Sequence, residues 1–323
     1  MNYILFVTGP TASGKTDFSI KLAERLSMKF GVQAEIINAD TGQFYTKLSI
    51  GTAKPDWRAL SIKHHLFDIV DTPKNFNVVA YRDLLMKTAR SIQTQGKLAI
   101  VVGGSLFYIR SLFWPPKEEL GAITRSDVTG SYERLQQVDP ERANAINPGD
   151  TYRIQRALAI WDATGKKPSE YEPEFKPNFH SRIVFIDLPR ELIYERINER
   201  TKQMIDHKNG GWIEEVERMQ GTPWEDFLKE KKLIGYPDIL SWLESGGDKT
   251  VLTALIQQKT RKYAKRQVTF WKKFRTILDV CAKKSSYLCR TGAVDRTDDV
   301  VVEDIVMLVE KDLDFVRKTK GET

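Results

Sequence analysis

The sequence predicts an α/β fold with a mostly parallel sheet, and three observations support this. Short apolar runs, which suit buried strands, are each followed by turn residues and a helical pattern. The clearest runs are residues 3–7, 34–37, 98–102 and 183–186. Helical patterns such as 17–29 and 78–95 lie between them, and strands that alternate with helices favour a parallel sheet. A glycine-rich loop also follows the first run directly.

Composition and charge exclude some classes of protein. The 323 residues are 41% hydrophobic and 29% charged, which is ordinary for a folded globular protein. We find no apolar run long enough to span a membrane and no signal peptide. Cys281 and Cys289 have neither metal-ligand nor CxxC spacing. We therefore expect a cytoplasmic protein with reduced thiols, no membrane contact and a monomeric state.

The alternation of strands and helices breaks near Trp114 and resumes at Arg182. The intervening stretch contains several prolines and two helical patterns, at 131–138 and 151–163. We predict a helical insertion at 114–179 in a core formed by 1–113 and 180–280. Residues 281–323 are predicted to be a peripheral C-terminal extension.

The glycine-rich loop matches the pattern G-x4-G-K-T between a strand and a helix, the context that supports a phosphate-binding loop. Its residues are Gly9, Pro10, Thr11, Ala12, Ser13, Gly14, Lys15 and Thr16. Such a loop directs backbone N–H groups and a helix N-terminus at phosphate. Lys15 supplies positive charge, and the Thr16 hydroxyl suits a magnesium ion. The loop predicts a P-loop NTPase-like core that binds a diphosphate or triphosphate; the alternative is a chance glycine turn.

Asp40 follows the second predicted strand. Ligands of open α/β sheets bind beyond the carboxyl ends of the strands, so Asp40 is expected near the phosphate loop. Its carboxylate could accept a proton or help to hold a metal. An alternative is that Asp40 only caps the next turn. The pair His64 and His65 favours a structural role, since no further His, Cys or Asp cluster suggests a zinc site.

The segment 259–275 is basic and contains no acidic residue, although the whole chain has a net charge of only +7. Its basic residues are Lys259, Arg261, Lys262, Lys265, Arg266, Lys272, Lys273 and Arg275, with four aromatic residues between them. A helix of this kind can bury its aromatics and present its charges to a phosphate backbone. The alternative is a solvated helical face. We favour the interpretation that this segment binds nucleic acid.

Eight short segments together form a family pattern. They are GPTASGKT (9–16), INAD-x-x-Q-x-Y (37–45), IGTAKP (50–55), HHL-x-DIVD (64–71), VGG (102–104), R-I-x-R-A-L (153–158), IGY (234–236) and TR-x-x-AKRQ (260–267). Their order and extent, from about residue 3 to 275, resemble the tRNA dimethylallyltransferase family, also called tRNA isopentenyltransferases. The resemblance implies transfer of a dimethylallyl group from dimethylallyl diphosphate to the N6 amine of adenosine 37, beside the anticodon. Diphosphate is released, and Mg²⁺ is the expected cofactor.

The resemblance also implies roles for individual residues. Asp40 matches the general base, Ser105 a threonine near the pyrophosphate, and Arg200 a pyrophosphate-binding arginine. Gln43 matches the residue that recognises the target adenine, in a loop with Thr41 and Gly42. In the insertion, contacts to the tRNA anticodon stem-loop are expected from Arg125 and from Tyr152, Arg153, Ile154, Gln155 and Arg156. The charge pattern of the basic segment, rather than the resemblance, gives the expectation that Arg261, Lys265 and Arg266 bind tRNA.

The chain departs from the family pattern at a few positions. Thr41-Gly42 replaces a usual Ser-Met pair, Ser105 replaces threonine, and Leu106-Phe107 stands where Gly-Leu is frequent. A hydroxyl is kept at Ser105. Three alternatives remain: an adenylate isopentenyltransferase acting on free AMP, ADP or ATP, a P-loop nucleotide kinase, and a non-catalytic RNA-binding protein.

Overall fold

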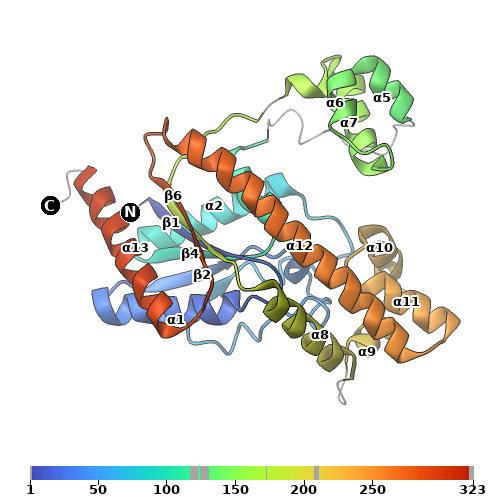
Figure 1. The fold of residues 1–323 in the computed structure, drawn as a ribbon, viewed down its shortest axis with the longest axis horizontal. Helices are drawn as coiled ribbons and strands as arrows, with labels where there is room; N and C mark the ends of the chain where they lie inside the picture. The colour runs from blue at the N-terminus through green and yellow to red at the C-terminus, as the bar shows by residue number, and fades with distance from the viewer. Residues whose placement is uncertain (1, 117–122, 124–130, 172, 207–210, 320–323) are drawn as a thin grey trace. The chain divides into compact units, whose positions relative to one another are not determined.

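A computed structural model describes residues 2–116, 123, 131–171, 173–206 and 211–319. Six parallel strands form one sheet in the order β3-β2-β4-β1-β5-β6 (Figure 1). The strands are β1 (Tyr3–Thr8), β2 (Ala34–Asn38), β3 (His64–His65), β4 (Leu98–Gly103), β5 (His180–Ile186) and β6 (Cys289–Val294). The predicted α/β fold with a parallel sheet is confirmed.

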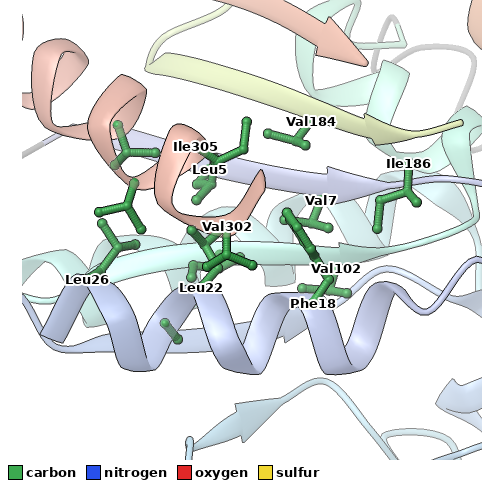
Figure 2. Packing of buried hydrophobic residues seen from close by; sticks show 14 of the residues in the cluster. Leu5, Val7, Phe18, Leu22, Leu26, Val102, Val184, Ile186, Val302 and Ile305 are labelled. Atoms are coloured by element: carbon green, nitrogen blue, oxygen red, sulfur yellow. The ribbon is translucent and has the colours of Figure 1, made fainter. Parts of the chain in front are cut away.

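One face of the sheet is covered by α1 (Lys15–Phe30) and α13 (Asp299–Thr319). Leu22 of α1 and Val302 of α13 belong to one hydrophobic cluster on this face, and they lie close together in Figure 2. Helix α1 ends at Gly31, whose left-handed backbone (φ 64°) lets its N–H bond to the Ser27 carbonyl. This packing fixes the first turn of α1, and with it the phosphate loop, against the end of β1.

Helices α2 (Val78–Thr94) and α12 (Lys249–Ala282) pack on the opposite face. Phe185 of β5 stacks on Trp271 of α12, with ring centroids 4.7 Å apart. Val184 of the same strand belongs to the cluster on the α1 face, as the twofold alternation of a strand requires. In the described part of the chain, we find no helix with the length and apolar character needed to cross a membrane.

The C-terminal segment is part of the core, so the prediction of a peripheral extension is wrong. Strand β6 pairs with β5 at the edge of the sheet, and α13 buries residues from Val301 to Val316. Asp312 of α13 is fully buried. Its carboxylate accepts hydrogen bonds from Tyr3 Oη at 2.9 Å and from Arg182 Nε at 2.6 Å, and it forms an ion pair with Arg290 Nη1 at 2.9 Å. These bonds tie α13 to β1, β5 and β6.

Replacing Asp312 by alanine is expected to lower the free energy of unfolding by about 3–5 kcal/mol, because it leaves the buried Arg182 guanidinium without its counter-charge. Urea unfolding monitored by circular dichroism measures this change. The matched control is Asp314→Ala on the same helix, where an exposed carboxylate pairs with Arg317. Equal stability of the two variants would contradict a structural role for the buried carboxylate.

The remaining described helices of the large unit follow β4 and β5. They are α3 (Leu106–Phe113), α8 (Arg190–Asp206), α9 (Trp212–Glu217), α10 (Pro223–Lys231) and α11 (Tyr236–Ser245). Helix α8 packs along α12. It carries Arg200 toward the phosphate loop, where the guanidinium contacts Thr11.

Residues 111–176 form a second compact unit, where the sequence predicted an insertion at 114–179. The described residues of this unit include the helices α5 (Tyr132–Val138), α6 (Pro140–Asn144) and α7 (Thr151–Thr164). They enclose a small core that includes Leu135, Ile146 and Leu158. Asp139 is buried and accepts hydrogen bonds from the Arg142 N–H and from the N–H and hydroxyl of Ser169.

Candidate active site

The predicted phosphate-binding loop connects β1 to α1, and two of its glycines are required by its backbone. A Cβ atom at Gly9 would lie 2.8 Å from the Ile186 carbonyl oxygen, so only glycine fits there. Gly14, with φ +79°, turns the chain into α1 at Lys15. Lys15 Nζ donates a hydrogen bond to the Pro10 carbonyl at 2.8 Å and so folds back over the loop. The loop presents a cation and a helix N-terminus to one space.

Lys15, Arg200 and Asp40 interact electrostatically with one another beside this loop. Burial lowers the pKa of Lys15 to about 8, Asp40 opposes the shift, and the positive charge of Arg200 adds to it. Burial likewise lowers the pKa of Arg200. For Asp40, burial raises the pKa and outweighs the opposing effects of Lys15, the Gly42 N–H and Arg200. The structure therefore brings together the three charged residues that the sequence singled out.

Asp40 caps a turn, which is one of the two roles that the sequence left open. Its Oδ1 accepts a hydrogen bond from the Gly42 N–H at 3.1 Å and caps the 3-10 turn η1 (Thr41–Phe44). The Asp40 N–H donates to Asn38 Oδ1 at 3.0 Å, which fixes the backbone beyond β2. The same carboxylate interacts electrostatically with Lys15 and Arg200. Capping therefore holds the carboxylate in place beside the phosphate loop.

Ser105 connects the end of β4 to the loop after β2. Its Oγ accepts a hydrogen bond from the Thr41 N–H at 3.1 Å, and its own N–H donates to the Ala39 carbonyl at 3.1 Å. A Cβ atom at Gly103 would lie 2.1 Å from the Ala39 carbonyl carbon, so the two loops approach too closely for any side chain there. The hydroxyl thus contacts the residue that follows Asp40.

Gln43 holds the segment 50–55. Its Nε2 donates to the carbonyls of Thr52 and Ala53 at 3.1 and 3.2 Å. From the other side, the buried carboxylate of Glu215 accepts hydrogen bonds from the backbone N–H groups of Ser49, Ile50 and Gly51 and from the Tyr236 hydroxyl. Glu215 was not identified from the sequence, although its partner Tyr236 belongs to the IGY segment.

His64 and His65 have structural contacts, as the sequence favoured. His64 bonds to the Ile62 carbonyl through Nδ1, and His65 Nε2 lies 2.6 Å from the buried carboxylate of Glu35. Among the described residues, we find no group of three or more His, Cys, Asp or Glu side chains arranged to hold a metal ion.

The basic segment forms part of the single helix α12. Lys262, Lys265, Arg266 and Lys273, with Thr269 and Phe270, line a groove of about 470 Å³ on its surface. Lys265 and Arg266 are exposed, as predicted. Arg261 differs, because its guanidinium donates to Asn198 of α8 at 2.5 Å and lies over the Tyr194 ring. It contributes to helix packing as well as to the charge of this surface.

The residues predicted on the insertion helix lie in different environments. Tyr152 and Arg153 are exposed, and Gln155 is half-buried. Arg156 donates a hydrogen bond to the Ile123 carbonyl. Ile154 is only 3% exposed in the core of the small unit, so the prediction that its side chain contacts RNA is wrong. Arg125 lies outside the described residues.

Comparisons with known proteins identify the family of the chain. The model of the IPP transferase family matches residues 43–274. The tRNA dimethylallyltransferase of Thermotoga maritima is 34% identical over 283 residues, which cover 84% of this chain and 90% of that protein. The same-named protein of Anoxybacillus flavithermus is 36% identical over 282 residues, covering 83% and 87%.

Two solved structures share the fold. The tRNA isopentenylpyrophosphate transferase from Bacillus halodurans aligns with a TM-score of 0.62 at 26% identity, covering 99% of this chain and 100% of that chain. A eukaryotic dimethylallyltransferase aligns with a TM-score of 0.70 at 24% identity, covering 93% and 75%, and supports the fold alone.

Proposed function

The chain belongs to the IPP transferase family of enzymes, and we propose that it transfers a dimethylallyl group from dimethylallyl diphosphate to tRNA. The proposed acceptor is the exocyclic N6 amine of the adenosine next to the anticodon, at position 37. The observation that carries the proposal is the half-buried Asp40 carboxylate, which interacts electrostatically with Lys15 and Arg200 beside the loop of residues 9–16. These three residues combine a base, which can accept the amine proton, with two cations, which can stabilise the departing diphosphate.

The donor is proposed to bind with its diphosphate in the loop of residues 9–16. Lys15, Arg200 and the loop amides then lie where negative charge builds up as the diphosphate leaves. The Thr16 hydroxyl, in the first turn of α1, would be the group of this chain that holds a magnesium ion. When bound, this ion neutralises part of the diphosphate charge.

The acceptor adenine must leave the base stack to reach this space. In the proposed step, the N6 amine forms a bond to the allylic carbon while the bond from that carbon to the diphosphate oxygen breaks. The diphosphate leaves with the electron pair, and the amine proton passes to Asp40. Its raised pKa makes Asp40 a stronger base than an exposed aspartate. Gln43 and Ser105, which hold the loops around Asp40, are proposed to position the adenine.

The exposed charges of α12 and the exposed part of α7 are proposed to bind the RNA backbone. We propose that the protein acts as a monomer. Action on tRNA also fits the cytoplasmic location expected from the sequence.

Replacing Lys265 and Arg266 together by alanine is expected to weaken tRNA binding and leave donor affinity unchanged. The slope of log Kd against log salt concentration should decrease by about one unit for each phosphate group that the variant no longer neutralises. Filter binding at several salt concentrations measures both quantities.

The matched control is the double replacement of Lys21 and Arg25 by alanine, which removes two exposed cations from α1 on the opposite face of the sheet. If both double variants keep the affinity and salt slope of the parent, then the α12 surface is only a solvated face.

The proposed function is tested by supplying labelled dimethylallyl diphosphate with either unmodified tRNA or AMP. Label is expected in tRNA. Label in AMP alone would favour an adenylate isopentenyltransferase. Transfer of phosphate from ATP to a nucleotide, without prenyl transfer, would favour a kinase.

A further inference from the structure

Gln267 lies on the buried face of α12, between the phosphate loop and the turn that follows β4. Its Oε1 accepts a hydrogen bond from the Thr11 N–H at 2.9 Å, and its Nε2 donates to the Gly104 carbonyl at 3.0 Å. The side chain is 6% exposed. Both ends of the amide are therefore occupied, and the two bonds fix its orientation.

The two residues that Gln267 contacts, Thr11 and Gly104, are connected to the proposed reacting groups through further hydrogen bonds. Thr11 also accepts a hydrogen bond from Arg200 Nη2 at 2.6 Å, so this loop residue is held by both α12 and α8. On the other side, Gly104 precedes Ser105, whose Oγ accepts from the Thr41 N–H beside Asp40. One amide thus joins the loop for the leaving group to the loop that carries the base.

We propose that Gln267 is a positioning residue that sets the phosphate loop at a fixed distance from the Asp40 loop. This inference rests on the proposed function. Transfer requires the amine, the allylic carbon and the leaving oxygen to be aligned, and misplacement by about 1 Å can cost about a hundredfold in rate. Gln267 acts through Thr11 and Gly104 rather than on the substrates.

Gly104 provides an independent way to disturb the same contact. A Cβ atom there would lie 2.5 Å from Gln267 Nε2, while its next neighbour, the Gly9 carbonyl oxygen, would be at an ordinary 3.5 Å. Alanine at this position would therefore displace the glutamine amide and little else. The glycine is needed because of the side chain opposite it.

The test compares Gln267→Met with Gln257→Met. Methionine keeps the approximate shape of glutamine but makes neither hydrogen bond. Gln257 lies on the same helix, and its Nε2 donates to the Asn198 carbonyl at 2.9 Å, away from both loops. At saturating donor and RNA, the single-turnover rate of Gln267→Met should fall about tenfold to a hundredfold. That of Gln257→Met should stay at the parent value.

A merely structural glutamine would lower the melting temperature and leave the saturated rate unchanged, and that result would overturn the inference. Gly104→Ala should slow transfer too, and the double variant Gly104→Ala, Gln267→Ala should be no slower than Gln267→Ala alone. Effects that multiply would also overturn the inference. An inactive parent protein would instead refute the proposed function, so the two failures are distinguishable.

Discussion

Replacement of Asp40 by asparagine is expected to lower the single-turnover rate of transfer about a hundredfold to ten-thousandfold, the usual contribution of a general base. Asparagine keeps the oxygen that accepts the Gly42 N–H, so the cap of η1 should survive. It cannot accept the amine proton. The rate is measured at saturating donor and tRNA, where weaker binding does not contribute.

The stability of the Asp40→Asn variant separates lost chemistry from lost structure. Because burial raises the pKa of Asp40 in the folded state, the ionised carboxylate destabilises the fold above that pKa. A neutral asparagine removes this cost, so at neutral pH the variant should be at least as stable as the parent.

The pH dependence of the rate provides a second check. The parent rate should fall as pH decreases through the raised pKa of Asp40, and the variant should not show that fall. An unchanged rate in Asp40→Asn would leave Asp40 as a capping residue only.

Replacing either Lys15 or Arg200 by alanine is expected to lower turnover about a hundredfold to a thousandfold, since each removes a charge placed on the leaving group. The control is Arg190→Ala at the start of α8, where an exposed guanidinium pairs with Glu191. Steady-state kinetics with varied donor measure the effect. Near-normal turnover in one of the two variants would remove that residue from the mechanism.

Lys15 is expected to give kcat/KM for the donor a dependence on pH of its own. Its pKa of about 8 in the free protein means that the side chain loses its charge as pH rises through that value. Apparent kcat/KM for the donor should therefore decrease above about pH 8, because the neutral amine attracts the diphosphate less. The Lys15→Ala variant should lack this decrease.

The strands of the sheet interior and the phosphate loop were predictable because their signals are local. The apolar runs starting at Tyr3 and Leu98 are buried on both faces of a parallel sheet, which keeps them continuous in the sequence. Strand β6 was missed because it lies at the sheet edge, where its exposed and half-exposed residues give no apolar run. Helix α13 is clearly amphipathic, but its partner α1 is far away in the sequence.

The site was predictable as a set of residue types, whereas the contacts between them were not. Asp40 and Lys15 were identified by motif, yet the burial that shifts both pKa values depends on the whole fold. Gln267 stands in an identified segment, but its partners Thr11 and Gly104 are 256 and 163 residues away. Ile154 was assigned by its place in a motif, and only the packing of the small unit shows that it is buried.

Prenyl transfer to the adenine amine is tested most directly by deleting that amine. Two anticodon stem-loop RNAs are compared, one with adenosine at position 37 and one with purine riboside, which lacks only the 6-amino group. With labelled dimethylallyl diphosphate, we expect label in the adenosine RNA and none in the purine RNA. Equal labelling of both RNAs, or no labelling of either by a folded protein that binds the donor, would contradict prenyl transfer to this amine.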